Sequence, residues 1–200
     1  MTKPAIDFWY DFASTYSYVA AMRIDGLAET AGVTVRWRPF LLGPIFQAQG
    51  WNNSPFNIYP AKGRNMVRDM ERLCDELGIG FRLPGPFPQN SLLAARLALA
   101  GLDEGWGEAF SRAVYSAEFG DGVTISEPSV LGDLLRQLGQ SPDAAFARAQ
   151  SDTIKTKLRD QTTEAQQRGI YGAPNFTTED GELFWGNDRL EQALRWAAKK

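Results

Sequence analysis

The stretch from Asp7 to Ala20, with the sequence DFWYDFASTYSYVA, decides how the rest of the chain is arranged. Its first residues are aromatic and aliphatic, as in a buried strand, and beyond Ala13 the apolar residues recur at helical spacing. Ser14 therefore lies at or beside the N-cap of a helix. Free backbone N–H groups and the positive end of the helix dipole meet there, so this position favours an anion.

A second strand follows the helix. Residues 33–40, VTVRWRPF, alternate apolar and polar side chains, as a half-buried strand does. With the first strand and the helix they predict a βαβ unit whose strands run parallel. Residues 43–60 are rich in Gly, Pro and Asn and show little periodicity, which predicts a long loop of the functional kind.

The remaining chain is helical and then returns to strands. Helices are expected at 60–78, 91–102, 106–118, 128–139, from 142 onward and at 152–168, followed by a hairpin at 174–185 and a last helix at 189–198. The order βαβ, helical block, ββα predicts an α/β protein with a thioredoxin-like fold interrupted by an all-helical insertion domain. The thioredoxin-like domain would comprise residues 1–59 and 169–200, and the insertion residues 60–168.

The amino-acid composition limits the classes of partner that the protein is expected to bind. The 200 residues correspond to one domain or one domain with a large insertion, and a hydrophobic content of 44% is ample for a packed core. Lys and Arg total 21 against 24 acidic residues and form no basic run, so nucleic-acid binding is not expected. The N-terminus has neither the pattern of a signal peptide nor that of a membrane span, so a cytoplasmic protein without a membrane partner is expected.

Two residue counts exclude classes of chemistry. The chain has no histidine, which removes histidine-based triads and nearly every catalytic zinc arrangement, and no metal site is expected. Its one cysteine, Cys74, cannot form an intrachain disulfide or a CxxC pair, so a dithiol oxidoreductase is excluded. Helical spacing places Cys74 on the side of Met70, Leu73 and Leu77, which predicts a buried core residue rather than a reactive thiol.

The turn before the first helix is the chemical position of a thioredoxin-type layout, where a cysteine is usual. Here Ser14 occupies it, and Gly172-Ala173-Pro174 enters the late hairpin, where a proline is commonly cis and faces that turn. Ser14 could be only an N-cap and Pro174 only an edge-strand proline. Alternatively, a cradle without its own cysteine could hold the thiol of another molecule.

Free-energy magnitudes permit such a borrowed thiol. A thiol has a pKa of about 8.5, and lowering it to about 6.5 takes about 2.7 kcal/mol. A helix N-terminus supplies about 0.3–2 kcal/mol. A hydroxyl bonded to a charged sulfur adds about 1.5–3 kcal/mol, by analogy with other charge-assisted hydrogen bonds. Together these terms suffice without a histidine.

Several motifs resemble one known family. Residues 11–18, DFASTYSY, resemble the D-F-x-S-P-Y-S-Y motif of the 2-hydroxychromene-2-carboxylate isomerases, relatives of kappa-class glutathione transferases and of the DsbA-like thioredoxin fold. The likeness continues through Asn53, residues 60–63 (PAKG), 172–174 (GAP) and 184–189 (FWGNDR). Each motif is weak alone, but the ordered set spans nearly the whole chain and is specific.

The resemblance implies a glutathione site. Ser14 matches the family's catalytic serine, which holds the glutathione sulfur as a thiolate, with Thr15 and Tyr16 in the same turn. Ala173, before Pro174, would pair its backbone with the cysteinyl part of the tripeptide. The other implied glutathione-binding residues are Asn53, Lys62, Asp188 and Arg189, the last two at the γ-glutamyl end.

Two further features concern this site: its charged residues and the positions at which the sequence differs from the family's motifs. Glutathione carries an ammonium and two carboxylates, so one acid and one or two bases suit it. Without the resemblance, Lys62, Asp188 and Arg189 would be read as solvated helix-end charges. Thr15 replaces the family's usual proline, which makes the turn less rigid, and Asn175 replaces its usual threonine, which could alter substrate choice.

Aromatic residues could wall a pocket for a planar substrate. The candidates are Trp9, Tyr10, Phe12, Tyr16, Trp51 and Phe56. A central strand is buried on both faces, so Trp9, Tyr10 and Phe12 are expected mainly in the core.

Three functions remain open. The family implies a cytoplasmic, homodimeric enzyme that interconverts 2-hydroxychromene-2-carboxylate and trans-o-hydroxybenzylidenepyruvate with glutathione as cofactor, a step of aromatic degradation. The same cradle would serve a kappa-type transferase acting on another electrophile. The third alternative is a non-enzymatic thioredoxin-fold binding module that has lost its cysteines.

Overall fold

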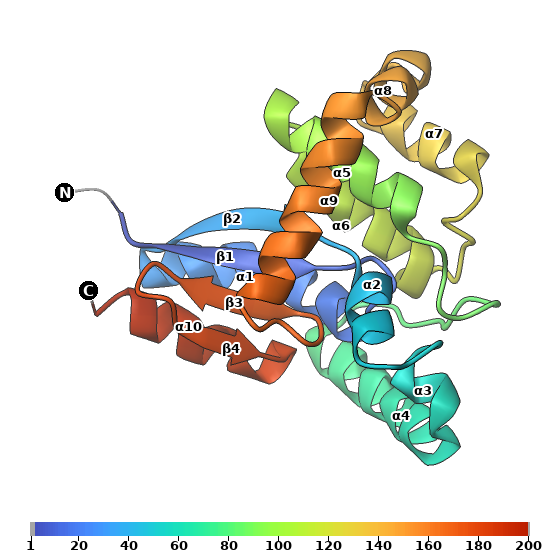
Figure 1. The fold of residues 1–200 in the computed structure, drawn as a ribbon. Coiled ribbons are helices and arrows are strands. Elements are labelled where there is room, and N and C mark those ends of the chain that lie inside the picture. Colours follow the sequence, from blue (N-terminus) through green and yellow to red (C-terminus); the bar gives the residue numbers. More distant parts are fainter. Residues whose placement is uncertain (1–2, 200) are drawn as a thin grey trace.

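A four-stranded mixed sheet with the order β2-β1-β3-β4 lies at the centre of the protein (Figure 1). The computed structural model describes residues 3–199. Strand β1 (Ala5–Tyr10) pairs in parallel with β2 (Thr34–Pro39) and antiparallel with β3 (Asn175–Thr178), and β3 pairs antiparallel with β4 (Leu183–Trp185). The predicted βαβ unit and the late hairpin are thereby confirmed.

Strand β1 is buried along its whole length because elements cover both faces of the sheet. On one face Phe8 lies in register with Trp37 and Phe176, and its ring stacks on that of Phe176 with centroids 5.5 Å apart. On the other face the Trp9 ring packs edge-on against Phe40, at 6.3 Å. The contacts of Phe8 hold β2, β1 and β3 in one register.

The helices lie on both sides of the sheet (Figure 1). Helix α1 (Thr15–Ala31) connects β1 to β2, and α10 (Leu190–Ala197) packs against α1 and β3. Helix α4 (Pro60–Leu77) also contacts α1. The block drawn above the sheet contains α5 (Leu92–Glu104), α6 (Gly107–Tyr115), α7 (Pro128–Gln137), α8 (Pro142–Ala149) and α9 (Asp152–Gln167).

The prediction of a loop at residues 43–60 is wrong for most of that segment. Two short helices occupy it, α2 (Leu42–Ala48) and α3 (Pro55–Ile58). Helix α2 forms because Leu42 and Ile45 are buried in a cluster with Trp9 and Phe40. Tertiary burial thus overrides the weak local helical signal of this Gly- and Pro-rich segment.

Two other helix ends differ from the prediction. The helix expected at 106–118 is α6 followed by a π-helical segment, η1 (Ser116–Gly120). The last helix is preceded by a 3-10 turn, η2 (Asn187–Arg189). Segments of π-helix are rare and often lie near functional sites, and η1 carries Glu118, whose side chain is fully buried.

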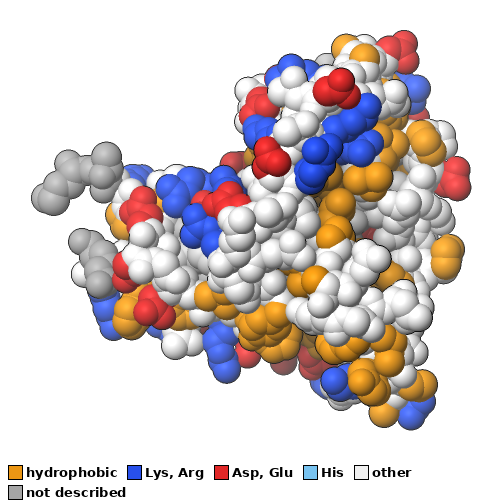
Figure 2. Space-filling model, viewed as in Figure 1, with side chains coloured by type: hydrophobic (Ala, Val, Ile, Leu, Met, Phe, Trp, Pro, Cys, Tyr) orange, Lys and Arg blue, Asp and Glu red, His pale blue; other side chains and the backbone are white. Residues whose placement is uncertain are grey.

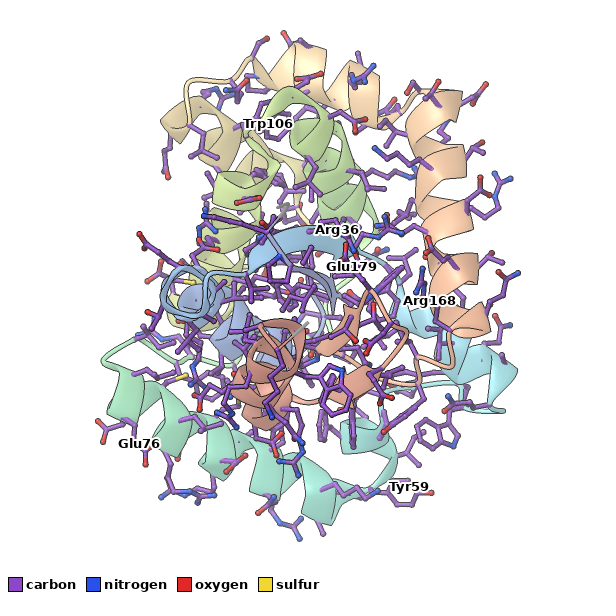
Figure 3. The ribbon with its side chains drawn as sticks, turned by 90° about the vertical axis from the view of Figure 1, so that its left-hand side faces the viewer. Arg36, Tyr59, Glu76, Trp106, Arg168 and Glu179 are labelled. Carbon is purple, nitrogen blue, oxygen red and sulfur yellow. The ribbon has the colours of Figure 1, made fainter. Side chains whose placement is uncertain are left out.

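The molecular surface mixes both signs of charge on the face shown in Figure 2, where hydrophobic side chains gather over α3 and α4 and beside the end of β4. In the side view of Figure 3, Tyr59 lies at the start of α4 and Glu76 near its end, while Arg36 and Glu179 lie next to each other over the sheet, 3.5 Å apart. Within residues 3–199, no helix has the length and apolar character needed to cross a membrane.

Candidate active site

A cavity of about 1930 Å³ opens at the first turn of α1. Its walls come from that turn, the α2–α3 segment, α4, residues 88–92 and the segment that carries β4 and η2. Most of the predicted site residues line it: Ser14, Tyr16, Asn53, Lys62, Ala173, Asp188 and Arg189. The cavity therefore brings together side chains that are far apart in the sequence.

Ser14 is the N-cap of α1, as predicted, and it also bridges to the late hairpin. Its Oγ accepts a hydrogen bond from the N–H of Ser17 at 3.2 Å and donates one to the backbone oxygen of Ala173 at 3.0 Å. The N–H groups of Thr15 and Tyr16 have no acceptor among the described residues. The positive end of α1 thus faces the cavity at Ser14.

Three residues near Ser14 lie behind the cavity wall rather than on it. Thr15 is fully buried, and Pro174 is buried after a cis Ala173–Pro174 bond, as expected for a proline at this place. Asn175 is fully buried and donates from Nδ2 to the Gly172 oxygen at 2.6 Å. Asn175 therefore shapes the turn that presents Ala173, and it does not line the cavity as a substrate contact would.

The α4 side of the cavity carries one base and one acid. The Nζ of Lys62 lies 4.8 Å from the centre of the Tyr59 ring. Asp69 accepts the Tyr16 hydroxyl at 2.9 Å and is paired with Arg72 at 3.0 Å. Burial, then the hydrogen bond to Asp69, raises the pKa of Tyr16, so this phenol stays protonated. Asp69 was not predicted, although it lies two helical turns from Lys62 on the same face.

The η2 segment of the lining carries Asp188 and Arg189, which form an ion pair of 3.2 Å between mostly exposed side chains. Asn53 accepts with its Oδ1 from Ser54 N at 2.7 Å and from Asn57 Nδ2 at 3.1 Å, and Ser54 is the N-cap of α3. Charges of both signs therefore line the cavity together with Ser14 and Ala173.

The predicted aromatic residues fall into two groups, those buried in the core and those that line the cavity. Trp9, Tyr10 and Phe12 are fully buried in the core, as expected. Tyr16, Trp51 and Phe56 do line the cavity, and four further aromatic residues that were not predicted join them: Phe46, Tyr171, Phe184 and Trp185. They form close ring pairs, with Phe46 and Trp51 at 5.5 Å and Tyr171 and Trp185 at 5.0 Å. Phe184 and Trp185 lie within the 184–189 motif, and Tyr171 directly precedes the 172–174 motif.

Cys74 is confirmed as a core residue. Its side chain is 1% exposed in α4, and burial raises the pKa of the thiol to about 11. A thiol so protonated is a poor nucleophile. Any thiolate at Ser14 must therefore come from another molecule.

Comparisons with known proteins agree with this geometry. A model of the DSBA-like thioredoxin domain matches residues 5–195. A 2-hydroxychromene-2-carboxylate isomerase from Sphingobium xenophagum is 33% identical over 193 residues, 96% of this chain and 96% of that protein. Glutathione S-transferase kappa 1 from Caenorhabditis elegans is 27% identical over 200 residues, 94% of this chain and 88% of that protein.

A solved structure shows the same likeness in three dimensions. The structure of a 2-hydroxychromene-2-carboxylate isomerase superposes with a TM-score of 0.83 at 28% identity, covering 94% of this chain and 91% of that one. The resemblance and the thioredoxin-type fold are thereby confirmed. The chain belongs to the DSBA-like thioredoxin domain family, in the group that includes the 2-hydroxychromene-2-carboxylate isomerases.

Proposed function

We propose that the protein is a glutathione-dependent isomerase that interconverts 2-hydroxychromene-2-carboxylate and trans-o-hydroxybenzylidenepyruvate. The observation that carries the proposal is the Ser14 hydroxyl at the mouth of α1, hydrogen-bonded to Ala173 and lining a large cavity. The relatives are named as isomerases and glutathione transferases, which supports an enzyme. We further propose a cytoplasmic location, on the N-terminal sequence, and a homodimer, on the family resemblance alone.

The residues present fit glutathione. The Ala173 oxygen accepts the Ser14 hydroxyl, so an incoming amide N–H that bonds to Ala173 would release this hydroxyl. The cysteinyl N–H of the tripeptide is such a donor. The released Ser14 hydroxyl can then donate to the adjacent sulfur, while the first turn of α1 supplies its dipole. One acid and two bases at the rims, Asp188 with Arg189 and Lys62, suit the ends of the tripeptide.

Glutathione when bound would supply a thiolate that adds to the conjugated ring system and is later expelled, so that the cofactor is returned. Ser14 would hold that sulfur anionic and would not itself attack the substrate. The cavity volume of about 1930 Å³ exceeds the ~300–1,000 Å³ of most small-molecule sites, which leaves room for the tripeptide and a planar acid together. The aromatic rings of Phe46 and Trp51 offer a flat apolar wall to that second ligand.

Two assays test the proposal against its alternatives. Calorimetry with glutathione comes first, because no heat of binding would favour a non-enzymatic module. The chromene carboxylate is then supplied with glutathione, and both isomer and free thiol are measured. An isomerase forms product with full recovery of glutathione. A transferase of the kappa type consumes glutathione in proportion to product, and absence of chromene turnover would overturn the isomerase assignment.

Trp51 should act on the aromatic substrate and not on glutathione. We expect Trp51→Ala to raise the KM for the chromene carboxylate up to about tenfold, because aromatic pairs contribute about 0.5–1.5 kcal/mol beyond area burial. The Kd for glutathione should stay unchanged. Ile58→Ala is the matched control, since Ile58 is exposed in the same segment and does not line the cavity. Equal effects of Trp51→Ala on both ligands would contradict this assignment.

A further inference from the structure

Asp11 is a buried acid at the floor of the cavity. Asp11 is 3% exposed, and both of its carboxylate oxygens accept hydrogen bonds from backbone N–H groups. Oδ1 accepts from Ala13 N at 3.0 Å, in the turn before Ser14, and Oδ2 accepts from Leu42 N at 2.7 Å, at the start of α2. Ser91, which precedes α5, lines the cavity together with Asp11, and its hydroxyl lowers the pKa of this carboxyl.

The backbone oxygen of Asp11 adds two more connections. It accepts from Ser14 N at 3.0 Å and from the hydroxyl of Tyr115, at the end of α6, at 2.9 Å. One residue therefore joins the starts of α1, α2 and α5 to the end of α6, directly beneath Ser14. No sequence motif required these connections, because Ala13, Leu42, Ser91 and Tyr115 lie in separate segments.

The charge of Asp11 lies where an anion is favoured. Backbone N–H groups from the turn before α1 (Ala13) and from the first residue of α2 (Leu42) donate to it. Burial raises the pKa of Asp11, but the donors at Leu42, Ser91 and Ala13 oppose this. Both oxygens accept hydrogen bonds from N–H groups, and neither donates one. The geometry is that of a carboxylate.

The titratable groups that face Asp11 carry no positive charge that would balance the negative charge of its carboxylate. Tyr115 faces it from α6 and Glu118 from η1, and burial raises the pKa of both well above the usual range, so both stay neutral. Helix α2 and the start of α5 face Asp11 with an N–H group and a hydroxyl. The charged residues that line the cavity lie on α4 and in η2: Lys62, Asp69, Asp188 and Arg189.

We propose that Asp11 is a positioning residue of the thiolate site: it fixes the Ser14 turn against α2 and α5, and its negative charge sets how readily a thiol at Ser14 ionises. This inference rests on the proposed glutathione function. The charge opposes the helix dipoles and the Ser14 hydroxyl, so it holds the bound thiol less acidic than those groups alone would make it. Asp11 thereby limits how strongly the sulfur is held as an anion, and a thiolate of higher pKa is the stronger nucleophile toward the substrate.

The experiment measures ionisation of bound glutathione by its thiolate absorbance in the ultraviolet, as a function of pH. For Asp11→Asn the midpoint should fall by on the order of one pH unit, because removal of a nearby negative charge favours the thiolate. If Asp11→Asn only disturbed the position of the Ser14 turn, the midpoint would rise, because the donors at Ser14 would be misaligned. A midpoint that is unchanged or higher in Asp11→Asn would overturn the inference.

Two further variants keep the test decisive. Ser91→Ala keeps Asp11 and removes one donor from it, so the midpoint should rise by a few tenths of a pH unit. If Asp11→Asn does not fold, an unchanged midpoint in Ser91→Ala overturns the inference. Asp7→Asn is the control: Asp7 is another buried acid of the same chain segment, paired with Arg36 at 2.8 Å, and its loss should leave the midpoint unchanged. A wild-type protein that shows no thiolate signal overturns the proposed function itself, whereas a wild-type signal without these shifts overturns only the role of Asp11.

Discussion

Ser14→Ala is expected to lower turnover of the chromene carboxylate about 10- to 100-fold near neutral pH. The reason is the loss of a hydrogen bond to a charged sulfur, worth about 1.5–3 kcal/mol. Without that bond the pKa of the bound thiol rises, so less thiolate is present at any given pH. The pH at which activity appears should therefore also rise, and part of the lost turnover should return in alkaline solution. Steady-state rates measured across the pH range give both quantities.

The N-cap role of Ser14 needs a control, because the same hydroxyl accepts from Ser17 N. Loss of an N-cap costs about 0.5–2 kcal/mol of stability without touching a ligand. Ser141 caps α8 in the same way, accepting from Ala144 N at 3.5 Å. Ser141→Ala should lower stability modestly and leave the pH profile of activity unchanged. If Ser14→Ala behaves like Ser141→Ala, then Ser14 is a cap and nothing more.

Glu118→Gln is expected to stabilise the protein at neutral pH by up to about 3 kcal/mol. Glu118 is fully buried, and neither carboxylate oxygen has a hydrogen-bond partner among the described residues. Burial, followed by the nearby charge of Asp11, raises the pKa of Glu118 well above its ordinary value of 4.5. The folded protein therefore keeps the proton that the unfolded chain releases above that pH. Stability from this residue is fully present below about pH 4.5 and is lost as the pH rises toward the folded pKa.

Glutamine has the same shape and cannot ionise, so the variant should lack this loss. Urea unfolding at about pH 4 and about pH 8 gives the comparison, because the two proteins should differ far more at the higher pH. Glu76→Gln is the control, since Glu76 is exposed near the end of α4 (Figure 3) and should keep the wild-type pH dependence. A constant difference between wild type and Glu118→Gln at both pH values would mean that folding does not raise the pKa of Glu118.

The candidate site shows how far local sequence patterns reach. Ser14 could be placed at the start of α1 because capping and helical spacing act within one turn of the chain. The bond from Ser14 to Ala173 spans 159 positions, and only the thioredoxin-type layout suggested that these segments meet. The aromatic wall of Phe46 and Trp51 was only half predicted, because α2 forms through burial against Trp9 and Phe40 rather than through its own helical signal.

By itself, the sequence determined the βαβ start, the late hairpin, the longer helices, the burial of β1 and of Cys74, and the place of Ser14, because side-chain periodicity and capping mark each of them locally. The tertiary structure alone decided what surrounds Ser14. It placed the carboxylate of Asp11 against the N–H groups of Ala13 and Leu42, and it buried Glu118 with no hydrogen-bond partner among residues 3–199. It also placed Thr15 and Pro174 behind the cavity wall. These features depend on contacts between distant segments, which the local periodicity of side chains does not encode.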